Sequence, residues 1–291
     1  METPRTGAQE SFRTIISAPG LQNILTRPDV VVLDARFSLD DETWGARAFS
    51  EGHIPTAQRA DLSEHLAGPI VPGVTGRRPL PDPADFARQL GTWGIDESTQ
   101  VVVYDAESGL MAAARAWLMM RWLGHDRVAV LDGGLAAWID AGGEVTVAET
   151  PRSPRTFVPR IREDLLVEAD EVDAQRVLEP TRVFDSRGLD VHHGRVPSHD
   201  PVNGHIANTG LADRARTLGP DGRLRSTTEL QAYYRSLIGD LNPGDVIFYC
   251  GSGVTAAQNV LAMEHAGLPG SRMYVGSWSE WITDPSRAIE L

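Results

Sequence analysis

The chain of 291 residues contains a single cysteine, Cys250. One thiol can form neither an intramolecular disulfide framework nor a multi-cysteine metal site, so disulfide-rich and zinc-finger-like classes are excluded. No apolar run approaches the roughly 18 residues that a membrane-spanning helix requires, and residues 1–5 lack the apolar core of a secretory signal. We therefore expect a cytoplasmic protein that binds no membrane.

Basic residues are few relative to acidic ones. The chain has 27 Lys and Arg against 40 Asp and Glu, a formal net charge of −13. An acidic chain repels phosphate backbones, so we expect no nucleic-acid partner. Hydrophobic residues make up 41% and charged residues 23%, which is the composition of a globular protein. The length fits two domains of about 150 residues each.

Four short motifs recur in the same order in the two halves of the chain. Each half has an apolar run ending in Asp-x-Arg, a Gly-His-Ile step, a second apolar run ending at a polar or reactive residue, and a Gly-rich turn leading to Trp. Chance agreement of this kind is improbable, so we interpret the chain as a duplication. The matched positions are Asp34 and Asp185, His53 and His205, Asp105 and Cys250, and Trp138 and Trp281.

Each half has the elements of an α/β fold. Runs such as 101–104 and 246–249 are typical of fully buried strands in a parallel sheet. Residues 110–123 and 254–266 are rich in good helix formers. Strands that alternate with helices predict, in each half, a mainly parallel sheet flanked by helices.

Proline marks the expected boundaries. The Pro-rich segment 146–162 is interpreted as a linker between a first domain of 10–145 and a second of 163–291. A second Pro-rich stretch, 68–83, predicts a long surface loop that borders a cleft.

The setting of Cys250 indicates an activated thiol. A buried strand delivers it to the carboxyl end of a sheet, where open α/β folds place ligands. Gly251 and Gly253 allow the backbone N–H groups to converge, and a helix opens at Val254 and Thr255. This arrangement stabilises a thiolate, with the loop amides and Ser252 as the expected contributors. The alternative is a small buried cysteine that only packs.

The length of this loop separates two chemistries. Cysteine phosphatases and arsenate reductases need an Arg six positions after the cysteine to clamp a tetrahedral oxyanion. Position 256 is Ala, which disfavours that chemistry. A cradle without this Arg suits a smaller electrophile, such as a sulfur atom held as a persulfide.

The segment Cys250-Gly251-Ser252-Gly253-Val254-Thr255 resembles the active loop of the 3-mercaptopyruvate sulfurtransferases, within the two-domain rhodanese family. The resemblance extends in order over nearly the whole chain. It implies two tandem rhodanese-like domains, a catalytically silent first domain with Asp105 in the cysteine's place, and no metal or organic cofactor. His53 and His205 belong to scaffold motifs of that family.

The segments that bind the donor depart from the family pattern. An Arg that contacts the substrate carboxylate in the family is replaced by Val191, which is followed by two histidines. Where the family has a His before Leu-Pro in the first-domain loop, this sequence has Arg77-Arg78-Pro79-Leu80-Pro81. Our candidates for binding the donor are Arg187, Arg195, His192, His193 and Arg78, because Arg pairs bidentately with carboxylates and sulfonates and loop positions carry function.

These features predict a sulfurtransferase that acts as a monomer. It takes sulfur from a small donor, with 3-mercaptopyruvate favoured, and passes it to a thiol, such as a thioredoxin-like protein, or to cyanide. A thiosulfate:cyanide sulfurtransferase is the alternative enzyme. A non-catalytic persulfide carrier or redox-sensing module is the alternative of another class, favoured by the substituted segment 191–193.

Overall fold

A computed structural model of the chain describes residues 11–106 and 110–291. The segment 1–5, which lacks the core of a secretory signal, and position 10, the expected start of the first domain, lie outside the described residues. Within the described part, no helix is long and apolar enough to cross a membrane, and no group of three or more His, Cys, Asp or Glu side chains could hold a metal ion.

The first half forms a five-stranded parallel sheet in the order β1-β5-β4-β2-β3. Its central strands β2 and β4 are buried at every residue, as expected of strands covered on both faces by helices. The strands are β1 (Ile15–Ile16), β2 (Val30–Asp34), β3 (Gln58–Arg59), β4 (Gln100–Tyr104) and β5 (Val128–Leu131), and the helices are α1 (Ala18–Ile24), α2 (Trp44–Glu51), α3 (Pro83–Thr92), α4 (Ala112–Trp122) and α5 (Gly134–Asp140).

The second half repeats this topology. Its parallel sheet has the order β6-β11-β10-β7-β9, and a short antiparallel pair joins β12 to β8. The strands are β6 (Leu166–Val167), β7 (Val183–Asp185), β8 (His205–Ile206), β9 (Gly210–Leu211), β10 (Ile247–Tyr249), β11 (Arg272–Tyr274) and β12 (Ile289–Glu290). The α-helices are α6 (Ala169–Gln175), α7 (Leu189–His192), α8 (Thr227–Ile238), α9 (Ala256–His265) and α10 (Ser277–Trp281), with 3-10 turns η1 (Glu163–Leu165), η2 (Arg214–Thr217) and η3 (Pro243–Asp245).

Equivalent registers confirm that the two halves share one fold. Tyr104 of β4 lies beside Asp34 of β2, and Tyr249 of β10 lies beside Asp185 of β7. The next residues, Asp105 and Cys250, therefore occupy equivalent places. The predicted fold class, two parallel sheets flanked by helices, is confirmed. Residues 147–162 run without helix or strand between the two sheets, and we retain 146–162 as the proposed linker.

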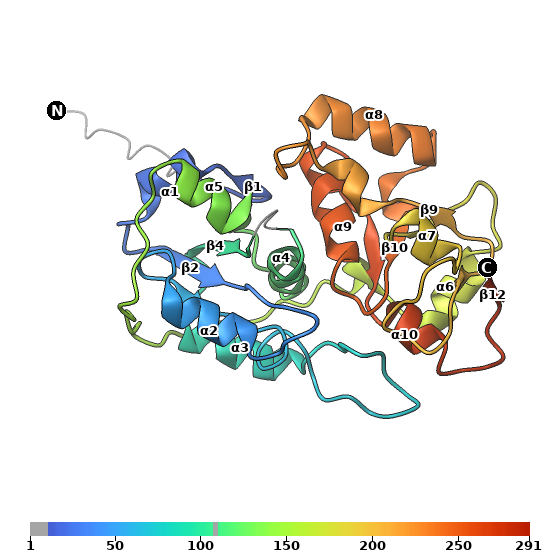
Figure 1. Cartoon of the computed structure of the whole chain (residues 1–291), viewed down its shortest axis with the longest axis horizontal. Helices are drawn as coiled ribbons and strands as arrows, with labels where there is room; N and C mark the ends of the chain where they lie inside the picture. The colour runs from blue at the N-terminus through green and yellow to red at the C-terminus, as the bar shows by residue number, and fades with distance from the viewer. Residues whose placement is uncertain (1–10, 107–109) are drawn as a thin grey trace.

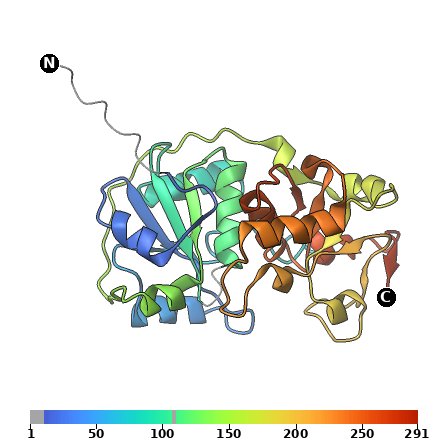
Figure 2. The same ribbon diagram turned by 90° about the horizontal axis from the view of Figure 1, so that it is seen from above.

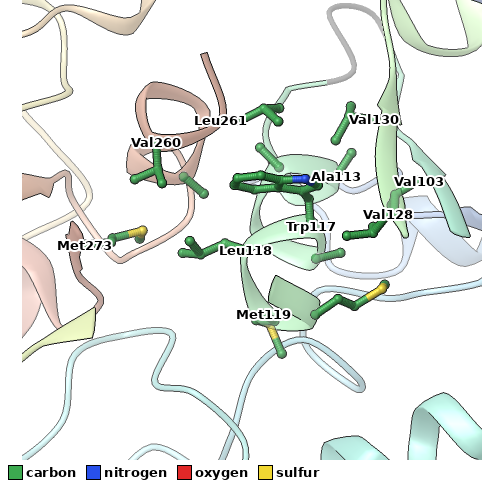
Figure 3. Packing of buried hydrophobic residues seen from close by; sticks show 14 of the residues in the cluster. Val103, Ala113, Trp117, Leu118, Met119, Val128, Val130, Val260, Leu261 and Met273 are labelled. Atoms are coloured by element: carbon green, nitrogen blue, oxygen red, sulfur yellow. The ribbon is translucent and has the colours of Figure 1, made fainter. Parts of the chain in front are cut away.

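The two domains lie side by side, with α4 of the first facing α9 of the second (Figure 1 and Figure 2). Trp117 and Leu118 of α4 are buried in the same apolar cluster as Val260 and Leu261 of α9 (Figure 3). Because one hydrophobic core continues across the boundary, the domains are held in a fixed relation. The helices that follow Asp105 and Cys250 thus meet at the interface.

Candidate active site

Cys250 follows β10 directly and is held in place by the turn that opens α10. Its N–H donates to Ser277 Oγ at 3.1 Å, and its carbonyl accepts from Trp278 N at 3.0 Å. The carbonyl of Gly251 accepts from Ser279 N at 2.9 Å. The Gly-rich turn before Trp281 therefore acts as the support of the cysteine loop.

The loop needs glycine at Gly253. Its φ of +76° lies in the left-handed region, and a Cβ atom there would stand 2.1 Å from the carbonyl oxygen of Val275. Only glycine combines that backbone conformation with so close a contact. The curl at Gly253 turns the following residues so that α9 begins at Ala256 with its N-terminus toward Cys250.

The surroundings of the Cys250 sulfur favour its thiolate. Burial acts to raise the pKa of the thiol, but hydrogen bonds from the Thr255 hydroxyl and from the N–H groups of Ala256, Ser252 and Gly253 outweigh it and lower the pKa below its ordinary value. Converging donors at a helix N-terminus stabilise negative charge in this way. The hydroxyl that lowers the pKa is that of Thr255, whereas Ser252 contributes its backbone N–H. The Ser277 hydroxyl also donates to the Cys250 sulfur, at 3.9 Å.

A cavity of about 400 Å³ opens at Cys250 and is lined by both domains. Apolar side chains and three arginines share the wall, which is typical of a site for a small organic anion. The first domain contributes Phe37, Leu39, Arg77 and Met111. The second contributes Arg187, Gly188, Val191, Pro197, Ser198, His199, Asp200, Arg214, Cys250, Gly251, Ser252, Val254 and Thr255.

Arg77 crosses from the first domain to reach the cysteine loop. It lies in the predicted surface loop 68–83, and its N–H donates to Ser279 Oγ at 3.0 Å. Its guanidinium binds the buried Asp200 carboxylate, and one of its nitrogens would lie 3.4 Å from a Cβ at Gly251. The ion pair therefore lies directly against the loop, which is consistent with the 1% exposure of Cys250.

Arg187 is the one predicted donor-binding residue with a charge on the cavity wall. It is 9% exposed, and its guanidinium binds both oxygens of Asp185 and the carbonyl of Gly204. Arg36 of the first domain binds Asp34 and the carbonyl of Gly52 in the same way. Because both domains share this arrangement, we infer that the main role of Arg187 is to stabilise the fold.

The two predicted histidines lie beside the cavity wall rather than on it. His192 is 4% exposed, stacks on His205 with ring centroids 3.7 Å apart and binds Asp185 through Nδ1 at 3.0 Å. In the first domain, Phe49 stacks on His53 at 3.9 Å. His192 thus takes the place of a packing aromatic residue. His193 is half-buried, and its ring packs edge-on against His192.

The other two predicted donor-binding residues, Arg195 and Arg78, bind partners outside the cavity. Arg195 is exposed and pairs with Asp190 at 3.3 Å. Arg78 donates to Ser63 Oγ at 2.9 Å and to Glu42 at 3.3 Å, both in the first domain. Neither residue belongs to the cavity wall, so the structure gives them no place in the site and their role in binding the donor stays a prediction.

Among the charged and imidazole side chains of the cavity, sequence reasoning missed four, namely Arg77, His199, Asp200 and Arg214. The sequence gives little indication of these residues because each lies in a loop or 3-10 turn. Arg214 could have been found by comparing the two halves of the chain. Ala60 N donates to the Asp34 carbonyl at 2.7 Å and Ala212 N to the Asp185 carbonyl at 2.8 Å, so Leu62 in the first half corresponds to Arg214 in the second.

The first domain has a carboxyl group where the second domain has its thiol. Asp105 accepts hydrogen bonds from the N–H groups of Met111 and Ala113, and it is buried. Burial raises the pKa of Asp105 to about 6, against the lowering effect of those two N–H groups. A carboxyl group cannot carry a transferable sulfur, so Asp105 cannot act as Cys250 is proposed to act.

The chain matches known proteins over nearly its whole length. Residues 17–141 match the family model of the rhodanese-like domain. A "Probable 3-mercaptopyruvate sulfurtransferase" of Pseudomonas aeruginosa is 43% identical over 280 residues, which are 96% of this chain and 98% of that protein. The thiosulfate sulfurtransferase of Bos taurus is 32% identical over 284 residues, covering 94% of this chain and 93% of that protein.

Solved structures of sulfurtransferases have the same fold as this chain. The 3-mercaptopyruvate sulfurtransferase of Leishmania major superposes with a TM-score of 0.81 at 28% identity, covering 92% of this chain and 74% of that one. SseA of Escherichia coli, a 3-mercaptopyruvate sulfotransferase with the rhodanese fold, superposes with a TM-score of 0.78 at 27% identity, covering 92% of this chain and all of that one.

The class of the protein follows from its two parallel sheets, its single thiol-bearing loop and the relatives that match nearly all of the chain. The chain belongs to the two-domain rhodanese family. Within that family it is a sulfurtransferase of the 3-mercaptopyruvate/thiosulfate sulfurtransferase type, and its single cysteine is Cys250.

Proposed function

We propose that the protein moves sulfur from 3-mercaptopyruvate to an acceptor through a persulfide on Cys250. The observation that carries this proposal is the convergence of the Thr255 hydroxyl and three backbone N–H groups on the sulfur, which lowers the pKa of the thiol despite its burial. A thiolate is the nucleophile that sulfur transfer requires.

The proposed first step transfers one sulfur atom. The Cys250 thiolate attacks the donor sulfur, an S–S bond forms, and the donor's C–S bond breaks. The electron pair of that bond leaves on carbon as the enolate of pyruvate, which takes up one proton. Cys250 is then a persulfide, and its charge is stabilised by the same loop donors.

The proposed second step regenerates the thiolate. An acceptor thiolate or cyanide attacks the outer sulfur of the persulfide, and the Cys250 sulfur departs with the electron pair of the S–S bond. Two half-reactions on one residue predict ping-pong kinetics. Thiols, including that of a thioredoxin-like protein, are the proposed acceptors. Both domains of one chain line the cavity, which supports a monomer as the acting unit, and we retain the cytoplasm as its proposed location.

Intact-protein mass spectrometry after treatment with 3-mercaptopyruvate tests the persulfide. We expect a mass increase of about 32 Da, one sulfur atom, that a reducing thiol removes. The Cys250→Ser variant should show no increase and no turnover. Loading at another site, or full turnover by Cys250→Ser, would falsify the proposal.

A second candidate is the thiosulfate:cyanide reaction. The three arginines of the cavity wall, Arg77, Arg187 and Arg214, favour an anionic donor of this kind as well. Because discrimination between donors resides in kcat/KM, the ratio of the two values for 3-mercaptopyruvate and thiosulfate decides between the reactions. Rapid multiple turnover of either donor would exclude a carrier that only stores sulfur.

A further inference from the structure

We infer that Arg214 binds the carboxylate of the sulfur donor, in place of the arginine that the family has at the position of Val191. This inference rests on the proposed function, since it assigns a role within that reaction. It makes Arg214 a specificity-determining residue of the cavity.

The charge of Arg214 is the first argument. Three arginines line the cavity at Cys250. Arg77 is paired with Asp200 at 2.8 Å and Arg187 with Asp185 at 2.7 Å. Among the residues that the structure describes, no carboxylate lies within ion-pair distance of Arg214. Its guanidinium donates to an amide oxygen, Gln258 Oε1, at 3.2 Å. Arg214 acts on the buried Asp105 carboxylate only at longer range, through its charge. Among the cavity arginines of the described chain, Arg214 is therefore the one without a direct carboxylate partner, and a donor anion can pair with it.

The rigidity of Arg214 is the second argument. Gln258 of α9 is fully buried and donates from Nε2 to the Arg214 carbonyl at 3.1 Å and to Thr217 Oγ1 at 2.7 Å. Arg214 N donates to the Ser186 carbonyl at 3.3 Å. The backbone of Arg214 is thus tied to the helix that follows the cysteine loop. A preorganised cation loses less conformational entropy on binding an anion.

The third argument is the difference between the two domains. Arg187 and His192 repeat arrangements of the silent domain, in which Arg36 and Phe49 have only scaffold roles. Arg214 has no such counterpart, because the equivalent position is Leu62, an apolar side chain with 2% exposure. A cation that is present only in the half with the thiol is expected to serve the reaction.

The apolar part of the wall specifies an organic anion. Val191, Val254 and Met111 line the same cavity, and burial of apolar surface favours a donor with a carbon skeleton over a bare inorganic ion. The chemical class is therefore a mercapto acid whose carboxylate pairs with Arg214 while its sulfur reaches Cys250. The fork of a guanidinium matches a carboxylate with two parallel hydrogen bonds.

The test uses two alkylating agents of nearly equal size, iodoacetate and iodoacetamide. Each reacts with the Cys250 thiolate, forming a thioether and releasing iodide, but only iodoacetate carries a carboxylate. The ratio of the two rates reports carboxylate recognition and cancels any change in thiolate fraction. In the Arg214→Gln variant we expect this ratio to fall roughly 10- to 100-fold, the effect of losing a hydrogen bond to a charged group. KM for 3-mercaptopyruvate should rise by a similar factor.

Arg216→Gln is the matched control. Arg216 lies two residues further on the same 3-10 turn, is exposed and faces the ring of Tyr233, so its loss should leave the ratio unchanged. Arg214→Lys keeps the charge and should retain most of the preference. Arg214→Met, which keeps an apolar stem, replaces the Gln variant if that one does not fold.

An unchanged ratio in both Arg214→Gln and Arg214→Met, or an equal fall in Arg216→Gln, overturns the inference. Failure of the proposed function has a different signature. In that case the wild-type chain forms no persulfide with 3-mercaptopyruvate, while the alkylation ratio still depends on Arg214.

Discussion

Arg77 and Asp200 form a two-pronged ion pair that joins the two domains against Gly251, with Nε–Oδ1 at 2.8 Å and Nη2–Oδ2 at 3.1 Å. The Asp200 side chain is only 2% exposed, whereas Arg77 is 34% exposed. The pair therefore closes one side of the cavity with a residue from each domain. It gives the first domain a direct structural part in the site.

Replacing Arg77 should weaken both the fold and the closure of the site. In Arg77→Met the Asp200 carboxylate stays buried without its cation, which we expect to cost about 1–3 kcal/mol in the free energy of unfolding, measured by urea denaturation. Alkylation of Cys250 should become faster. The matched control is Arg47→Met, because Arg47 pairs with Asp41 on the exposed surface, and it should be neutral. Equal midpoints for the two variants would contradict this role.

Thr255 should control the acidity of Cys250. The Thr255→Val variant keeps the shape of the side chain but removes the hydroxyl that lowers the pKa of the thiol. The pKa then rises, the thiolate fraction at neutral pH falls, and the acid limb of the alkylation rate moves to higher pH. We expect alkylation by iodoacetamide at neutral pH to be roughly 2- to 10-fold slower.

Ser252→Ala is the control for that measurement. Ser252 acts on the thiol through its backbone N–H, which alanine retains, so its pH profile should match the wild type. A profile that moves in Ser252→Ala and not in Thr255→Val would refute the assignment of the hydroxyl to Thr255.

Gly251 and Gly253 should differ sharply in how well they tolerate substitution by alanine. Gly253→Ala forces an L-residue into φ +76° and sets its Cβ 2.1 Å from the Val275 carbonyl oxygen. We expect a loss of at least about 2 kcal/mol of stability, seen by thermal unfolding, together with loss of sulfur loading. Gly251→Ala should fold normally, since its Cβ meets Arg77 at 3.4 Å. Similar unfolding temperatures for the two variants would show that the curl at Gly253 is not required.

The duplication makes much of the fold predictable. The matched motifs alone align Asp105 with Cys250, and the strand registers agree with that alignment. The central strands β2, β4 and β10 are recognisable because each contains a short run of apolar residues, and such runs suit a sheet covered on both faces. The scaffold arrangements around His53 and His205 also follow from the repeated Gly-His-Ile step.

The donor site is harder to predict. His192 and Arg195 lie in the segment that replaces the family's substrate-binding arginine, yet His192 turns inward to Asp185 and Arg195 pairs with Asp190 in solvent. Neighbouring positions on α7 point to different sides of the helix, so spacing alone does not say which of them faces the cavity. Val191 is the residue of this segment that does.

The sequence by itself determined the duplicated α/β scaffold and the place of Cys250 between a strand and a helix, because both depend on local patterns of apolar residues and glycine. Only the tertiary structure decided what surrounds the sulfur. Arg77 of the first domain reaches the cavity wall at Cys250 because the two domains pack together through α4 and α9. Arg214 reaches the same wall within the second domain, where η2 packs against α9. Which charges remain unpaired there depends on contacts between segments that no local pattern encodes.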